Sequence, residues 1–312
     1  MNIVKSGIKI NYISIKVSEK ETVLNFANKM QTIQKMMQSE KLYTPYCAAA
    51  NMPLVSCSKD TFCDRAFAFE SEEVMKTFLK PFLDRKIPIK GIIYTKKDRI
   101  NYFASLLSMN VDEVVYVENG NMHVFALSDI VKRQDTTNTP EPQRPVENPA
   151  LKLSTLYFIQ EASRQVPLEE KTDLKELEEE MAANLYKGMY IMPATIAGDQ
   201  KIEDLKAAEG KKNIQFNIPL VKDPKGDMYQ PVFTDNLEFS GYRKGAKIGM
   251  MKVPFLGLEK MLSKDAKGYM LNPNGFHLII SREMMQGLRV RFGGTANASD
   301  VGKVDADETE EG

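Results

Sequence analysis

Residues 217–221 read Asn-Ile-Pro-Leu-Val, and residues 51–55 read Asn-Met-Pro-Leu-Val, so four of five residues agree at a spacing of 166. Internal similarity in a fixed order is the signature of a repeated structural unit. Further matches follow in the same order, at spacings that shrink as loop deletions would make them: Lys59 with Lys225, Phe67 with Phe233, Gly91 with Gly249, Glu118-Asn-Gly120 with Pro273-Asn-Gly275, His123 with His277 and Ser128 with Ser281. The sequence therefore predicts two tandem homologous domains.

Hydrophobic periodicity predicts a similar order of elements in both copies. An amphipathic helix opens each one, because apolar residues recur every three or four positions from Val23 to Met37 and from Leu174 to Leu185. In the second copy, strands are predicted at residues 188–192, 214–221, 231–233, 247–253, 268–271 and 276–280, and helices at 256–262 and 282–288. In the first copy, strands are predicted at 90–94, 113–117 and 123–127, and helices at 99–109 and 129–133.

Two strands of the first copy are separated by Asn119-Gly120, the strongest short signal for a β-hairpin. Strands that alternate with helices and also form hairpins indicate a mixed sheet. The expected fold class is α+β (mixed α/β): two tandem homologous domains, each a mixed β-sheet flanked by helices.

A Pro-rich stretch, Gln134 to Ala150, divides the chain with four prolines among polar residues. Proline lacks the backbone N–H and restricts the residue before it, so this stretch is expected to be a semi-extended linker. The expected domains are residues 1–133 and 151–292. Residues 293–312 carry six acidic side chains against one lysine, and are expected to be a disordered tail.

Composition excludes several classes of function. The 312 residues hold 42 basic and 42 acidic side chains, so broad electrostatic binding of nucleic acid is not expected. Neither a secretory signal peptide nor a membrane span is expected, because long apolar runs are missing. Three cysteines without a C-x-x-C pair indicate free thiols in a reducing cytoplasm, although a Cys57–Cys63 redox pair is an alternative.

The second copy carries motifs that resemble a known family. They are Tyr190-x-x-Pro193, Pro219-Leu220, Pro231-Val-Phe-Thr-Asp235 and Tyr269-Met-Leu-Asn-Pro-Asn-Gly275. Their order over residues 165–290 resembles the SseB domain, named for the enhanced serine sensitivity protein. The first copy departs from it, with Ala66-Phe-Ala-Phe69 and Val117-Glu-Asn-Gly120 in place of two motifs, and is interpreted as a diverged copy. The resemblance implies a cytoplasmic bacterial protein and no established catalytic mechanism.

Two of these motifs fall at predicted strand ends, where loops often carry binding residues. We call the seven residues concerned the candidate surface: Phe233, Thr234, Asp235, Asn272, Pro273, Asn274 and Gly275. The same residue types also form turns and helix caps, so a purely structural role is the alternative.

Other chemistry-bearing residues give no legible site. The chain has only two histidines, His123 and His277, which the repeat places at matching positions, and one histidine per domain cannot form a multi-histidine metal site. No catalytic residue, metal ligand or cofactor is predicted. The eighteen methionines, several in pairs, suit either an irregular core or an adaptable partner groove.

The first hypothesis is a non-catalytic cytoplasmic binding or adaptor protein that engages a protein partner through the candidate surface. The second is a small-molecule-binding domain or an enzyme, with its site between the repeats. The third is a cytoplasmic component of a secretion or envelope system. The oligomeric state does not follow from the sequence.

Overall fold

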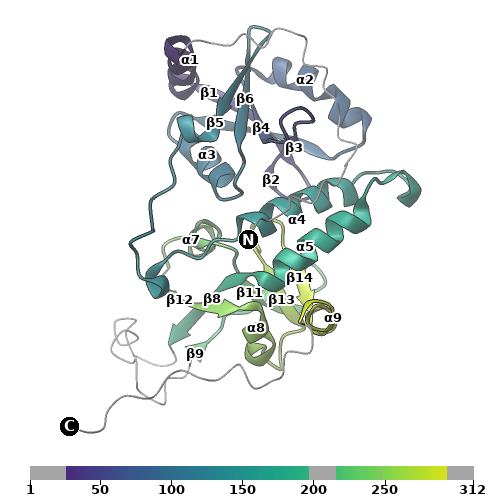
Figure 1. The fold of residues 1–312 in the computed structure, drawn as a ribbon. Helices are drawn as coiled ribbons and strands as arrows, with labels where there is room; N and C mark the ends of the chain where they lie inside the picture. The colour runs from purple at the N-terminus through teal and green to yellow at the C-terminus, as the bar shows by residue number, and fades with distance from the viewer. Residues whose placement is uncertain (1–25, 197–215, 247, 294–312) are drawn as a thin grey trace, which may run out of the picture.

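The computed structural model describes residues 26–196, 216–246 and 248–293. Helices pack against sheets that contain both parallel and antiparallel strands, so the predicted α+β class is confirmed (Figure 1). The predicted acidic tail lies almost entirely outside the described residues, as does the start of the first predicted helix.

The first half of the chain forms a seven-stranded sheet. Its elements are α1 (Phe26–Gln38), β1 (Lys41–Cys47), β2 (Met52–Pro53), β3 (Val55–Cys57), β4 (Asp64–Phe69), α2 (Glu72–Asp84), β5 (Ile89–Thr95), α3 (Arg99–Leu107), β6 (Glu113–Glu118), β7 (Asn121–Ala126) and the 3-10 turn η1 (Leu127–Asp129). The strand order is β2-β1-β4-β6-β7, with β5 paired to β1 and β3 paired to β4. Only β4 and β6 run parallel. The predicted hairpin is confirmed, since Asn119 and Gly120 have positive φ angles of 48° and 73° between β6 and β7.

The second half forms two smaller sheets. Its elements are η2 (Glu141–Gln143), α4 (Pro149–Ala162), η3 (Leu168–Glu170), α5 (Leu174–Lys187), β8 (Met189–Ile196), β9 (Phe216–Asn217), β10 (Val221–Lys222), β11 (Met228–Val232), α7 (Asn236–Arg243), β12 (Gly249–Pro254), α8 (Phe255–Met261), β13 (Gly268–Leu271), β14 (Leu278–Ser281) and α9 (Arg282–Phe292). The strand orders are β10-β11-β13-β14 and β12-β8-β9. A bridge between Ile191 and Phe233 joins the two sheets.

The two halves use the same kinds of strand pairing in the same order. The antiparallel pair β1–β5 has its counterpart in β8–β12, and the parallel pair β4–β6 has its counterpart in β11–β13. Each parallel pair is followed by a hairpin, β6–β7 or β13–β14. These pairings describe architecture and not descent, so the tandem duplication stays a prediction.

Three local predictions are wrong. His123 is inside β7, whereas His277 precedes β14 with a φ of 38°, so the two histidines do not occupy matching places. The helix predicted at 129–133 is replaced by the short turn η1. The strand predicted at 214–221 is broken into β9 and β10, because Pro219 between them has no backbone N–H to donate.

The Pro-rich stretch packs onto the second half of the chain. Val146 is buried beside Ile191, Phe233 and Phe239. Pro149 is the first residue of α4, a position that proline favours because its missing N–H would have no helical partner.

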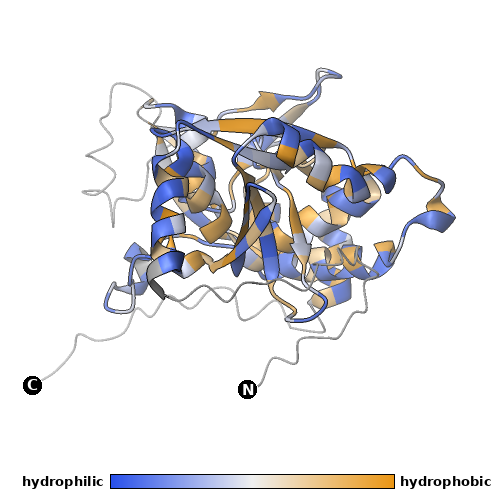
Figure 2. Ribbon diagram, turned by 90° about the horizontal axis from the view of Figure 1, so that it is seen from above, coloured by the Kyte–Doolittle hydropathy of each residue, from blue (hydrophilic) through white to orange (hydrophobic). Residues whose placement is uncertain are grey.

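Helix α4 lies between the two halves of the chain (Figure 1). The largest hydrophobic cluster runs through it: Leu151 and Leu156 of α4 join Leu106 of the first half and Leu185 of the second. Figure 2 shows hydrophobic residues gathered on the strands and on the helix faces that turn toward them, with hydrophilic residues on the outer faces. The described halves therefore share one continuous core.

Candidate functional site

The structure brings together the two motifs of the candidate surface. Thr234 and Asp235 lie between β11 and α7, and Asn272 follows β13 directly. Strands β11 and β13 are parallel neighbours, so their carboxyl ends meet at one edge of the sheet. The backbone N–H of Asn272 donates to the carbonyl of Val232 at 2.9 Å and extends this pairing.

Polar groups of the two motifs hydrogen bond to one another. Asn272 Oδ1 accepts from the Thr234 backbone N–H at 3.0 Å, and Asn272 Nδ2 donates to Thr234 Oγ1 at 2.9 Å. The Thr234 hydroxyl donates to Asp235 Oδ2 at 3.0 Å. Phe233, Thr234 and Asn272 are fully buried, and Asp235 is only 4% exposed. Four of the seven candidate residues thus lie inside the protein: Thr234, Asp235 and Asn272 hydrogen bond to one another, and Phe233 packs in a hydrophobic cluster.

Cap and turn geometry accounts for the positions of these residues. Asp235 Oδ1 accepts from the backbone N–H of Glu238 at 2.9 Å and caps α7. Asn272 has a φ of 49°, and its carbonyl accepts from the backbone N–H groups of Gly275 and His277. These contacts are those of the alternative interpretation, in which the residues form a turn and a helix cap.

The remaining candidate residues reach the surface and contact the first half of the chain. Asn274 is exposed, and Pro273 and Gly275 are half-buried. The carbonyl of Asn274 accepts from Asn51 Nδ2 at 2.9 Å, and Asn51 Oδ1 accepts from Lys90 Nζ at 2.6 Å. A binding role for this exposed loop stays a prediction.

Lys152 completes the buried polar cluster, although the sequence reasoning did not single it out. Its Nζ lies 2.8 Å from Asp235 Oδ2 and 3.3 Å from Glu238 Oε1, and donates to Ser108 Oγ at 2.8 Å. The only signal in the sequence is a single charge in the otherwise apolar stretch that opens α4. We call Lys152, Asp235, Glu238 and Ser108 the polar junction, because these residues come from α4, the second half and the first half.

Burial sets the electrostatics of the polar junction. One ammonium faces two carboxylates, and the Lys152 side chain is 2% exposed. Burial raises the pKa of Glu238 above its ordinary value; Lys152 opposes this shift and Asp235 adds to it. Lys152 bonds to Asp235 of the second half and to Ser108 of the first, so the junction connects the two halves. Removal of one member of the buried pair would leave an uncompensated charge.

Helix α4 makes further connections to the first half. The Gln160 side-chain amide accepts from the backbone N–H of Val55 at 3.3 Å and donates to its carbonyl at 3.1 Å. Glu161 pairs with Arg85 at 3.2 Å. The Gln160 amide thus bonds the β3 backbone, which also pairs with β4, and the Glu161–Arg85 pair holds α4 at the end of α2.

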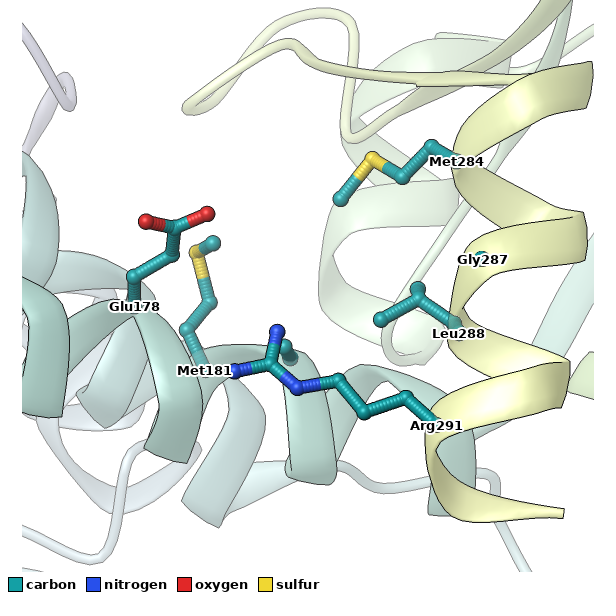
Figure 3. Close-up of a pocket in the computed structure, with 7 residues that line it drawn as sticks. Glu178, Met181, Met284, Gly287, Leu288 and Arg291 are labelled. Carbon is teal, nitrogen blue, oxygen red and sulfur yellow. The ribbon is translucent and has the colours of Figure 1, made fainter.

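A second feature is an open groove between α5 and α9, with a volume of about 330 Å³ (Figure 3). We call it the α5–α9 groove. Its lining residues are Glu178, Met181, Ala182, Met284, Gly287, Leu288 and Arg291. In Figure 3 the Met181 and Met284 side chains point into the gap between the helices, and Arg291 reaches from α9 toward α5.

Helix periodicity explains how the groove forms. Its lining residues on α9 recur at steps of three or four, so they share one face of the helix. The Met284–Met285 pair divides between two environments: Met285 is 2% exposed in the core, whereas Met284 is half-buried at the groove. Neighbouring methionines thus differ in exposure, and a partner-binding role for Met284 stays a prediction.

The described residues offer few other chemical sites. Cys47 is buried, while Cys57 and Cys63 are half-buried. Within residues 26–196, 216–246 and 248–293, no group of three His, Cys, Asp or Glu side chains is placed to hold a metal ion. Over the same ranges, no helix has the length and apolar character needed to cross a membrane.

No protein-family model and no curated protein matches this chain. Solved structures that are similar to it over much of its length include two Tic22 proteins. Tic22 from Plasmodium falciparum is 10% identical, with a TM-score of 0.19, over 84% of this chain and 98% of the other. Anabaena Tic22, a protein-transport protein, is 12% identical, with a TM-score of 0.18, over 83% of this chain and 96% of the other. At such TM-scores neither likeness assigns a function, and the resemblance to SseB stays a prediction.

Proposed function

We propose that this chain is a non-catalytic binding or adaptor protein that takes an apolar segment of a protein partner into the α5–α9 groove. Membership of the SseB-like family and a cytoplasmic location are parts of the same proposal. They rest on the motifs of the second half and on three cysteines that form no C-x-x-C pair in the sequence.

The observation that carries the proposal is the open, methionine-lined groove. Met181 and Met284 face a space of about 330 Å³ between two helices. Methionine is flexible and polarizable, so it adapts to different apolar partners and is common at binding surfaces that accept them. An apolar groove between helices is a standard way to bind a peptide.

The polar junction supports a structural role in the same protein. Its lysine, carboxylates and hydroxyl satisfy one another, and the Lys152 side chain is 2% exposed. A catalytic group needs access to substrate. The open groove is accessible to a partner, whereas Lys152 is buried from a substrate, so we favour binding at the groove over catalysis at the junction.

A groove-filling variant tests the proposal. A Cβ at Gly287 meets no atom within 4 Å, so Gly287→Leu places a side chain in the groove without a clash at its Cβ. Gly241 of α7 has the same open surroundings outside the groove, so Gly241→Leu is the matched control.

The full chain and both variants would serve as baits in source-cell lysate, with retained proteins identified by mass spectrometry and folding checked by circular dichroism. We expect a partner that the wild type and Gly241→Leu retain and Gly287→Leu loses. Equal retention by all three baits would remove the groove from the proposal.

A further inference from the structure

We infer that the occupant of the α5–α9 groove is an amphipathic α-helix with a basic flank. This inference rests on the proposed function and names the class of partner. Three features of the groove carry it: the nature of its walls, the glycine in one wall, and the balance of charge along its rim.

The walls favour a helix over a strand as occupant. Both are α-helices, whose backbone N–H and C=O groups are bonded within the helix. An added strand needs a free sheet edge to pair with, and both walls of the groove are helices. Met284 to Arg291 span seven helical steps, about 10 Å, so a partner helix would lie against two turns of α9.

Gly287 gives a partner close access to the backbone of α9. A glycine inside a helix is less favourable than an alanine, so its presence in α9 calls for a reason. Among the residues that the structure describes, none has an atom within 4 Å of the position that a Cβ at Gly287 would take, apart from its own helix and chain neighbours. Small residues let two helices approach closely, and Ala182 provides a second small residue on the opposite wall. Gly241 shows that an open helical glycine is not by itself a site; Gly287 differs because it lines a groove.

The groove is lined by two charged side chains, Glu178 and Arg291, and they differ in their ion pairing. Arg291 is paired with Glu179, and Arg289 is paired with Glu259 at 3.0 Å, so both arginines of this part of α9 already have carboxylate partners. Glu178 is exposed at the rim and forms no ion pair with any other residue that the structure describes. A basic side chain on the partner would meet Glu178, whereas an acidic one would be repelled.

Synthetic helices test the inference on the full chain. Three fluorescent peptides of about 18 residues, long enough to form a helix, would share one composition of leucines. The first places leucines at i, i+3, i+4 and i+7 with lysines along one flank; the second has the same stripe with glutamates; the third is a scrambled version of the first. Binding would be measured by fluorescence anisotropy at about 50 mM and about 500 mM salt.

We expect the lysine-flanked helix to bind about fivefold more tightly than the glutamate-flanked one at low salt, a ratio worth about 1 kcal/mol. Glu178→Gln should reduce this preference, and Glu178→Lys should reverse it. The matched control is Glu73→Gln, which changes an exposed glutamate of α2 and should leave the preference intact.

The outcomes separate the two proposals. If both stripe peptides bind equally well and Gly287→Leu abolishes both, the groove binds helices and the charge selection is wrong. If no peptide binds above the scrambled control, the helix-docking groove itself is wrong. If binding persists in Gly287→Leu, the peptides bind elsewhere and the inference fails.

Discussion

The Nζ of Lys152 lies 2.8 Å from Oδ2 of Asp235, and the two side chains are only 2% and 6% exposed. The pair joins helix α4 to the start of α7, and Ser108 adds the first half of the chain through a third contact. Because these contacts connect three elements, substitution of their residues should change the free energy of unfolding.

Removal of the Lys152 charge should strongly destabilise the protein. Lys152→Met leaves the buried Asp235 and the half-buried Glu238 without a cation, and loss of one partner of a buried pair costs about 3–5 kcal/mol. The free energy of unfolding would be measured by urea denaturation. The control is Lys76→Met, since Lys76 pairs with Glu72 at side-chain exposures of 69% and 53%, and such pairs contribute about 0–1 kcal/mol. Equal losses in both variants would contradict the importance of the junction.

The raised pKa of Glu238 predicts a pH-dependent contribution to stability. A carboxyl whose pKa is raised on folding binds its proton more tightly in the folded state, so its contribution is present at low pH. It is lost as the pH rises from the ordinary value of 4.5 through the raised value. Glu238→Gln should therefore gain stability relative to the wild type between pH 4 and pH 7. Denaturation at several pH values measures this gain, and a constant difference across the range would contradict it.

Two glycines should respond to alanine in opposite ways. Gly287→Ala should stabilise α9 by up to about 1 kcal/mol, because its Cβ meets open space and alanine favours a helix. Gly268→Ala should destabilise the protein, because its Cβ would collide with the backbone carbonyl of Ile280 on the neighbouring strand. Thermal melting shows whether each variant has a higher or a lower melting temperature than the wild type. A lower melting temperature for Gly287→Ala would show that its space is already used.

The amide of Gln160 should protect the backbone of Val55. Gln160→Ala removes both hydrogen bonds to that residue, and buried unsatisfied groups cost about 1–3 kcal/mol each. We expect faster hydrogen exchange at the Val55 amide. Exchange at Ala66, which pairs with Val55 inside the first sheet, should change less. Unchanged exchange at Val55 would contradict the bridging role of Gln160.

Local signals in the sequence predict several elements well. Strand β13 has the predicted bounds of Gly268 and Leu271, and the Asn119-Gly120 hairpin forms as expected. Both depend on short-range rules: turn residues with positive φ, and apolar runs bounded by glycine or proline.

Long-range relationships could not be predicted in the same way. Lys152 meets Asp235 across 83 positions, and one lysine in an apolar stretch does not reveal its partner. Thr234 and Asn272 are typical turn residues, which are exposed in most loops but are buried here because they bond to each other. The groove depends on which residue of the Met284–Met285 pair faces outward, and only the packed position of α9 decides that.

The position of α4 also determines the order in which the nascent chain can mature. The first half leaves the ribosome before the helix that completes it, so β3 lacks the Gln160 partner of Val55 until residues beyond 162 have emerged. A fragment that stops at the Pro-rich stretch would therefore present unpaired backbone and an uncovered apolar surface. A fragment in which the Val55 backbone is paired must therefore extend through Gln160 of α4, well past the apparent boundary between the halves.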